Sequence, residues 1–331
     1  MYLLDPKKSF YKANLHCHST RSDGHASLEE IKAEYMKRGY SVVAFTDHDA
    51  LYVNSSLTDE DFVAITSTEL AIKEDASAST LVSHRMKCAH LNFYALDEKN
   101  DMTPCYSLAY DKKKLPEVRY EGEYTRTYSP ECINEMIRIG HEKGFLVSLN
   151  HPSWSLQDSS DYLSYEGLDF VEIYNTGCVR AGHADDESVL DIMALNGKRV
   201  FCTAADDNHN EAGFDGPESD SFGGFVMINA QKLEYGAIMT ALKNGDFYAS
   251  SGPKIYSLER DGDTVSVSCS KAERIFLATD SRLRRSVAAP EKETVTKASF
   301  KLPKGDYSLF RIIVEDGSGK RAYTQFYDRA L

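Results

Sequence analysis

Short apolar runs that alternate with helix-like segments constrain the fold of this chain more than any other feature of its 331 residues. Several of the runs are almost continuously apolar, which is typical of strands covered on both faces in sheets flanked by helices. The alternation predicts an α/β protein whose parallel strands, joined by right-handed crossovers, form a barrel or a doubly wound sheet. The expected strands are residues 13–18, 41–47, 62–68, 88–96, 145–150, 169–175, 199–204 and 224–228.

Capping signals mark where the intervening helices begin and end. Ser27 and Glu30 have the spacing of a capping box, and the helix that they open should stop at Gly39. Ser129 followed by a proline opens a second helix, for which Gly144 is the expected end. Two further helices are expected to end near residues 197 and 245.

Two stretches interrupt the alternation. Residues 97–128 are polar and rich in tyrosine and charge, which predicts an inserted loop or lid beside a functional site. After residue 251 the helical signals end, and the turn sequences at 261–263 (DGD) and 316–319 (DGSG) separate strand-like runs. The chain should therefore consist of a large α/β domain, residues 1–251, and a small β-sandwich-like domain, residues 252–331.

The distribution of charge restricts the partners. The larger predicted domain carries 40 Asp and Glu against 23 Lys and Arg, within a net charge of −13 for the chain. A long nucleic acid is bound through many Lys or Arg contacts with phosphates, so this acidity disfavours it. A small phosphorylated molecule held by bound metal ions remains compatible with it.

The environment of the chain is indicated by what its sequence does not contain. No run approaches the roughly 18 apolar residues of a membrane helix, and the first residues have no signal-peptide pattern. The seven cysteines are scattered without a CxxC pair, which suits reduced thiols. We expect a cytoplasmic protein, and the sequence leaves its oligomeric state open.

The histidines carry the chemical signal. His16 and His18 lie two residues apart, and Asp207 and His209 repeat that spacing, so each pair can face one side of an extended segment. A single histidine is more often structural, but most of these candidates end or follow a separate predicted strand, and such ends meet at one face of an α/β barrel. The other candidates are Asp23, Asp47, His48, Glu69, His90 and His151.

These motifs together resemble the PHP (polymerase and histidinol phosphatase) family. The resemblance covers about residues 10–250 and rests on NLHCHSTRSDG (14–24), FTDHD (45–49), Glu69, His90, NHP (150–152) and the Asp207–His209 pair. The stretch 242–253 before the β domain is similar to the carbaryl-hydrolase-like subgroup. The resemblance implies a distorted (β/α)7 barrel with two or three divalent ions, for which zinc, manganese and iron are all suitable.

The resemblance also implies how the ligands are shared. Glu69 would bridge the first and third ions. Asp23 stands where histidinol-phosphatase-like members have a histidine, which favours manganese or iron at the second ion. The implied ligands are His16, His18, Glu69 and Asp207 for the first ion, Asp23, His48 and His209 for the second, and His90 and His151 for the third.

The expected reaction is hydrolysis of a small phosphorylated substrate by a metal-activated hydroxide, with the ions neutralising charge on the phosphoryl oxygens. We expect either His183 or a water on the third ion to supply a proton to the leaving group, and Asp47 to orient a ligand. His84 is a reserve ligand in place of His90, and His141 is interpreted as structural. The substrate-binding candidates, for each of which a surface or packing role is the alternative, are Arg21, Arg180, Trp154 and His25.

Other functions remain open at this stage. The same ions would serve a carboxylic or carbamate ester hydrolase, or an exonuclease acting on short oligonucleotides. A non-enzymatic alternative is a metal-containing binding module, in which the β domain recognises a partner. Complete retention of the ligand set argues against this last alternative.

Overall fold

The structure is a computed structural model that describes residues 1–74, 85–111, 113 and 118–331. Its long helices are α1 (Leu28–Lys37), α2 (Pro130–Glu142), α5 (Glu187–Leu195) and α6 (Tyr235–Asn244), and its short ones are η1 (Ser55–Leu57), α3 (Ser159–Tyr162) and α4 (Thr176–Arg180). The strands up to residue 250 are β1 (Tyr2–Leu4), β2 (Ser9–Asn14), β3 (Val42–Phe45), β4 (Val63–Lys73), β5 (Cys88–Ala95), β6 (Met102–Thr103), β7 (Arg119–Tyr120), β8 (Phe145–Leu149), β9 (Phe170–Asn175), β10 (Phe201–Ala205), β11 (Phe225–Ala230) and β12 (Phe247–Ser250).

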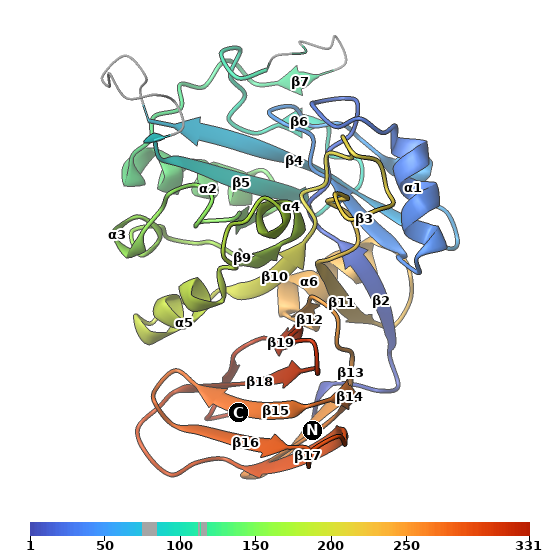
Figure 1. Ribbon diagram of the computed structural model, residues 1–331. Helices are drawn as coiled ribbons and strands as arrows, with labels where there is room; N and C mark the ends of the chain where they lie inside the picture. The colour runs from blue at the N-terminus through green and yellow to red at the C-terminus, as the bar shows by residue number, and fades with distance from the viewer. Residues whose placement is uncertain (75–84, 112, 114–117) are drawn as a thin grey trace.

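A large mixed sheet organises the first 250 residues (Figure 1). Its strand order is β10-β9-β8-β5-β4-β3-β2-β11-β12, and every strand from β3 to β5 is buried except for the last residue of β4. The α/β class is confirmed, but the expectation of parallel strands is correct only for β2-β3-β4 and β8-β9-β10. Strand β5 runs antiparallel to both neighbours, and β11 runs antiparallel to β2.

Direction was misread because a strand buried on both faces has the same apolar composition whichever way it runs. Strands β4 and β5 pair in antiparallel register, so the chain reverses its direction between them. Strand β10 lies at one edge of the sheet. It is close to β11 and β12, but no β-ladder joins it to either strand among the described residues. The closed seven-unit barrel therefore stays a prediction.

The four expected helices are present as α1, α2, α5 and α6, and the caps expected for α1 and α2 are observed. Ser27 and Glu30 form the capping box that opens α1, and Ser129 caps α2 with a proline at its first position. The long helices each pack on a strand of the large sheet: α1 on β3, α2 on β8, α5 on β9, and α6 on β11 and β4. No helix in the described part of the chain is long and apolar enough to cross a membrane.

The last eighty residues form two antiparallel sheets with a common core (Figure 1). One sheet has the order β1-β13-β14-β17, so the N-terminal strand belongs to it, and β19-β18-β15-β16 continues the large sheet through the pairing of β12 with β19. The strands are β13 (Ile255–Asp261), β14 (Thr264–Ala272), β15 (Arg274–Thr279), β16 (Arg284–Ala288), β17 (Val295–Lys301), β18 (Leu309–Glu315), β19 (Arg321–Thr324) and β20 (Tyr327–Asp328).

Candidate metal centre

The predicted ligands gather where several strands of the large sheet end. His16 and His18 lie just beyond β2, which ends at Asn14, so they belong to the segment after the strand and not, as expected, to the strand itself. Their segment is joined to the residues after β10, because Asp207 donates its backbone N–H to the carbonyl of His16 at 2.9 Å. A parallel bridge likewise ties His48, beyond β3, to β4.

Glu69 stands at the middle of the cluster and is almost completely buried. Its Oε2 is 3.1 Å from His48 Nδ1 and 3.5 Å from His18 Nε2. Its Oε1 faces three further imidazoles: His16 Nε2 at 3.2 Å, His90 Nδ1 at 3.2 Å and His151 Nε2 at 3.4 Å. One carboxylate therefore contacts five of the six predicted histidine ligands.

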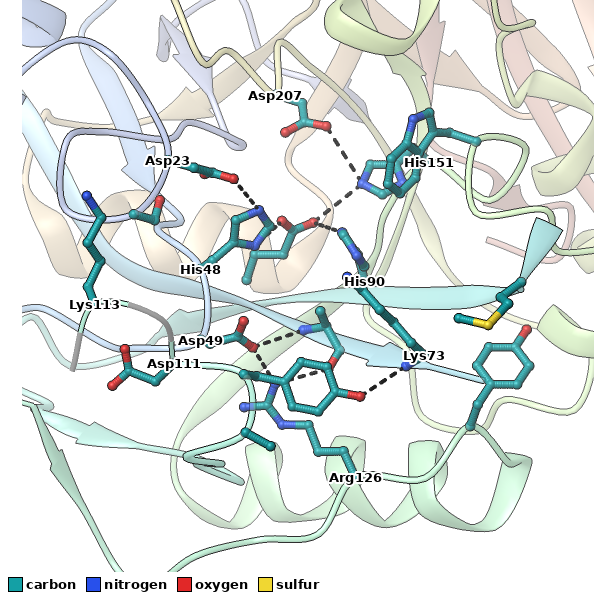
Figure 2. A pocket seen from close by; sticks show the side chains of 18 of the residues that line it. Asp23, His48, Asp49, Lys73, His90, Asp111, Lys113, Arg126, His151 and Asp207 are labelled. Atoms are coloured by element: carbon teal, nitrogen blue, oxygen red, sulfur yellow. Dashed lines mark hydrogen bonds and ion pairs between the residues drawn. The ribbon is translucent and has the colours of Figure 1, made fainter. Parts of the chain in front are cut away.

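Two aspartates extend the cluster in opposite directions. Asp207 Oδ1 is 3.1 Å from His16 Nε2 and 3.0 Å from His18 Nε2. Asp23 is half exposed and lies toward the opening, with carboxylate oxygens 3.5 Å from both His48 Nε2 and His209 Nε2. Figure 2 shows this alternation of imidazoles and carboxylates along one side of the pocket.

Three sets of these side chains have ligand atoms close enough to hold an ion. The outer group is His18, Asp23, His48 and His209; the two inner groups are His16, His18 and Asp207, and His16, Glu69 and His151. The grouping differs from the one implied by the motifs. His18 is shared between the outer group and an inner one, His16 is shared between the two inner groups, and Glu69 is grouped with His16 and His151. His90 is in none of the three groups, although it contacts Glu69.

The chemistry of these donors fits divalent cations. Four ring nitrogens at the centre are buried and form no hydrogen bond of suitable geometry with the described residues, although carboxylate oxygens lie 3.0–3.2 Å from three of them. Burial of such nitrogens is costly unless another group binds them. Mixed imidazole and carboxylate donors suit zinc, manganese or iron. The unpartnered nitrogens are His16 Nε2, His18 Nε2, His48 Nδ1 and His90 Nε2.

The crowded charges shift the protonation of the cluster. Burial acts to lower the pKa of His90, but Glu69 and Cys88 outweigh it and raise the pKa to about 10. Burial is likewise outweighed at His209, where Asp23 and Asp207 raise the pKa to about 9. At His48, burial and the neighbouring His18 instead lower the pKa to about 3.

The two inner carboxylates stay ionised. Burial opposes ionisation of Glu69 and Asp207, but the surrounding histidines hold the pKa of both groups well below the ordinary range. A dense set of negative oxygens beside protonated imidazoles is an arrangement in which cations can replace protons.

A pocket of about 1250 Å³ opens onto the cluster. The segment 97–128 contributes to its wall, where the buried Arg126 pairs with Asp49 and lies 4.9 Å from the ring of Tyr110. Figure 2 shows Arg126 and Asp49 in this part of the wall, on a different side of the pocket from His90 and His151. Arg21 and Trp154 also line the pocket, with the Trp154 ring 4.9 Å from that of His151.

Arg21 is fixed at the pocket, because its Nη1 donates to Asn54 Oδ1 at 2.7 Å and its guanidinium lies 4.8 Å from the ring of Tyr52. Trp154 is 41 % exposed, which leaves ring surface for a ligand. Both positions are compatible with the predicted substrate contacts, which stay predictions.

Three predicted residues are exposed and lie outside the pocket. His183 and Arg180 are exposed beyond β9 and do not line the pocket, because the chain turns away through α4; Arg180 donates to the carbonyl of Pro217. His25 is exposed outside the pocket, although its backbone N–H donates to the carbonyl of His209. A role at the reacting atoms is therefore not supported for His183.

Asp47 is buried and does not line the pocket. Its carboxylate accepts hydrogen bonds from Ser19 and Ser22, and it thereby holds the loop that carries Asp23. This contact is compatible with the orienting role expected for Asp47, which stays a prediction. His84 lies outside the described residues, and His141 pairs with Asp169 on the side of α2, as expected of a structural residue.

Sequence reasoning missed the buried polar residues behind the ligands. Asn150 donates to Glu69 Oε1 at 2.8 Å, and Glu172 lies 3.1 Å from His16 Nδ1. The available signal was a lone acid in the apolar strand FVEIYN, because an unpaired carboxylate is rarely buried.

A mixed α/β sheet with imidazoles and carboxylates grouped at strand ends defines a candidate metal centre of the kind used by hydrolases. No family model matches the chain, and no curated protein matches it. Solved structures do resemble it, at low identity.

The chain is similar to a two-domain protein from Bacteroides vulgatus that contains a predicted PHP-like metal-dependent phosphoesterase. The two sequences are 14% identical, the alignment covers 98% of this chain and 96% of that chain, and the TM-score is 0.48. A candidate metal-dependent phosphoesterase from Bifidobacterium adolescentis has 14% identity over 62% of this chain and 90% of that chain, with a TM-score of 0.39. An amidohydrolase from Chromobacterium violaceum, with bound sulfate and no metal, has 11% identity over 57% of this chain and 84% of that chain, with a TM-score of 0.37.

The resemblance to the carbaryl-hydrolase-like subgroup stays a prediction. At these TM-scores a functional assignment has to come from the side chains of the site.

Proposed function

We propose that this protein is a metal-dependent phosphoesterase that hydrolyses a small phosphorylated molecule. The observation that carries the proposal is the set of three overlapping ligand groups linked by Glu69 at the base of a pocket. When bound, divalent ions would lower the pKa of water and neutralise charge on a phosphoryl group.

The residues of the chain supply the remaining functions. Glu69 and Asp207 hold the imidazoles at contact distance, and their two negative charges would compensate part of the charge of the bound cations. Arg21, fixed by Asn54 at the pocket wall, can pair with a phosphoryl oxygen. Trp154 offers an apolar surface to the organic part of the substrate.

The test is a substrate screen with metal-loaded protein. The protein is purified, its metal content is measured, and phosphomonoesters, aryl acetates and short oligonucleotides are assayed with added manganese, zinc or ferrous iron. Turnover of a phosphomonoester is expected. His209→Ala, which removes a ligand of the outer group, should remove most of this turnover.

His183→Ala is the matched control, because it removes an imidazole of an exposed residue that does not line the pocket. It should keep the activity of the unmodified protein. Metal-loaded protein that hydrolyses aryl acetates but no phosphomonoester would contradict the proposal and favour the carboxylic ester alternative.

A further inference from the structure

Glu172 is a buried acid that belongs to none of the three ligand groups. It lies in β9 between the apolar residues Val171 and Ile173, and only 2% of its surface is exposed. A carboxylate in such a place destabilises the fold unless its oxygens are hydrogen-bonded. Its contacts therefore indicate what it does there.

Each oxygen of Glu172 is engaged. Oε1 is 3.1 Å from His16 Nδ1, and Oε2 accepts from the backbone N–H of His151 at 3.1 Å and from Asn175 Nδ2 at 2.8 Å. Asn175 Nδ2 also lies 3.1 Å from Asp207 Oδ2. One carboxylate thus reaches three predicted ligands: one through its ring, one through its backbone and one through a shared amide.

The contact with His16 decides which ring nitrogen faces the centre. With Nδ1 at Glu172, Nε2 lies 3.2 Å from Glu69 Oε1 and 3.1 Å from Asp207 Oδ1, and it has no hydrogen-bond partner in the described part of the chain. A carboxylate that accepts from Nδ1–H fixes the tautomer with a free Nε2 and makes that nitrogen a better metal ligand.

Two other imidazoles, those of His151 and His209, have weaker support at the nitrogen Nδ1. His151 Nδ1 is 3.2 Å from Ser155 Oγ, and His209 Nδ1 is 3.1 Å from the carbonyl oxygen of Asp207; both partners are neutral. The backbone of His151 also has φ near 30°, in the left-handed region that is unfavourable for most side chains. The bond from its N–H to Glu172 stabilises this conformation.

We propose that Glu172 is a positioning residue of the metal centre, which orients His16 and His151 so that the two inner groups bind their ions tightly. None of its recorded contacts involves the outer group. The inference rests on the proposed metal-dependent function, but it concerns metal affinity and not turnover.

The test is Glu172→Gln, which keeps the size of the side chain and removes its charge. The amide also turns an N–H₂ toward groups that need an acceptor. Metal-free protein is titrated with Mn²⁺ or Zn²⁺ against a competing chelator, and bound metal is counted by elemental analysis. We expect inner-ion affinity to fall about 10- to 100-fold, the range for loss of such a carboxylate, with the outer ion unchanged.

Two control variants are measured beside Glu172→Gln. Glu166→Gln, at an exposed glutamate that pairs with Lys198, should bind metal like the unmodified protein. Asp23→Asn should weaken the outer ion and leave the inner ions in place. Unchanged affinity in Glu172→Gln would overturn the inference. Equal weakening of every ion would also overturn it, because it would indicate a general loss of structure.

A measurement on the unmodified chain covers the case in which Glu172→Gln does not fold. Nitrogen-15 NMR of the metal-loaded protein should show His16 with its proton on Nδ1; a proton on Nε2 would refute the inference. If metal affinity responds as expected but no phosphoester is hydrolysed, the positioning role stands and the proposed function fails.

Discussion

Replacing Tyr35 with phenylalanine removes one buried hydroxyl from beneath the metal centre. The oxygen lies 2.8 Å from Asp206 Oδ2 and 2.9 Å from Asn208 Oδ1, and Asn14 Nδ2 donates to it at 3.2 Å. Asp206 and Asn208 alternate with two predicted ligands beyond β10, so the hydroxyl helps to hold that segment. Loss of a hydrogen bond to a buried carboxylate costs about 1.5–3 kcal/mol, and we expect about 2 kcal/mol.

The cost should depend on pH. Burial raises the pKa of Asp206 to about 6 despite its hydrogen-bond donors. Because this value is above that of the unfolded chain, the contribution of Asp206 to stability is greatest below about pH 4 and falls as the pH rises through 6. Removing a donor to the ionised form raises this pKa further. The destabilisation by Tyr35→Phe should therefore be larger at pH 8 than at pH 5.

The assay is urea denaturation of metal-free protein at both pH values, so that metal binding adds nothing to the difference. Tyr40→Phe is the control, because the Tyr40 hydroxyl is buried without a hydrogen-bond partner among the described residues, and the two rings are 4.8 Å apart. Its removal should change the unfolding free energy by less than about 0.5 kcal/mol or stabilise the protein. Equal effects of both variants would refute the reasoning.

Two further predictions concern the site. The raised pKa values of His90 (about 10) and His209 (about 9) leave both side chains protonated in metal-free protein at pH 7. Metal binding should therefore release roughly two or more protons and weaken as the pH falls. Calorimetry in buffers of different ionisation enthalpy measures the proton release, and a binding heat that is independent of the buffer would contradict the prediction. Gly24→Ala places a Cβ 2.4 Å from the carbonyl oxygen of His18, so it should lower the free energy of unfolding by about 1–3 kcal/mol and weaken binding of the outer ion. The control Gly236→Ala, which has open space in α6, should leave stability unchanged or raise it. Thermal unfolding and metal titration of both variants measure these effects, and equal results for the two would contradict the prediction.

The strand pattern predicted the class of fold but not its topology. Buried apolar runs placed seven of the eight expected strands within a few residues of their observed positions, and β2 begins four residues before the expected run because it pairs with β11 from Ser9 onward. The direction of β5 could not be predicted, since it depends on whether the connection from β4 crosses the sheet or turns back.

The site shows the same division. All nine predicted ligands lie in one cluster, although their binding of metal stays a prediction. The exposed residues Arg180, at the end of α4, and His183, just beyond it, were assigned to the pocket because they follow a strand, and the turn into α4 directs them away from it. Sequence position reports where a segment begins, not where its side chains point.

By itself, the sequence determined the elements and the metal-ligand chemistry, because apolar periodicity, caps and the grouping of histidine with aspartate are local properties of the chain. Tertiary structure alone decided that Glu69 would contact five imidazoles, that His18 would be shared between groups, and that Glu172 would support His16. These contacts join residues far apart in the sequence, 156 positions for His16 and Glu172, and their distances follow from the packing of strands, which no local pattern records.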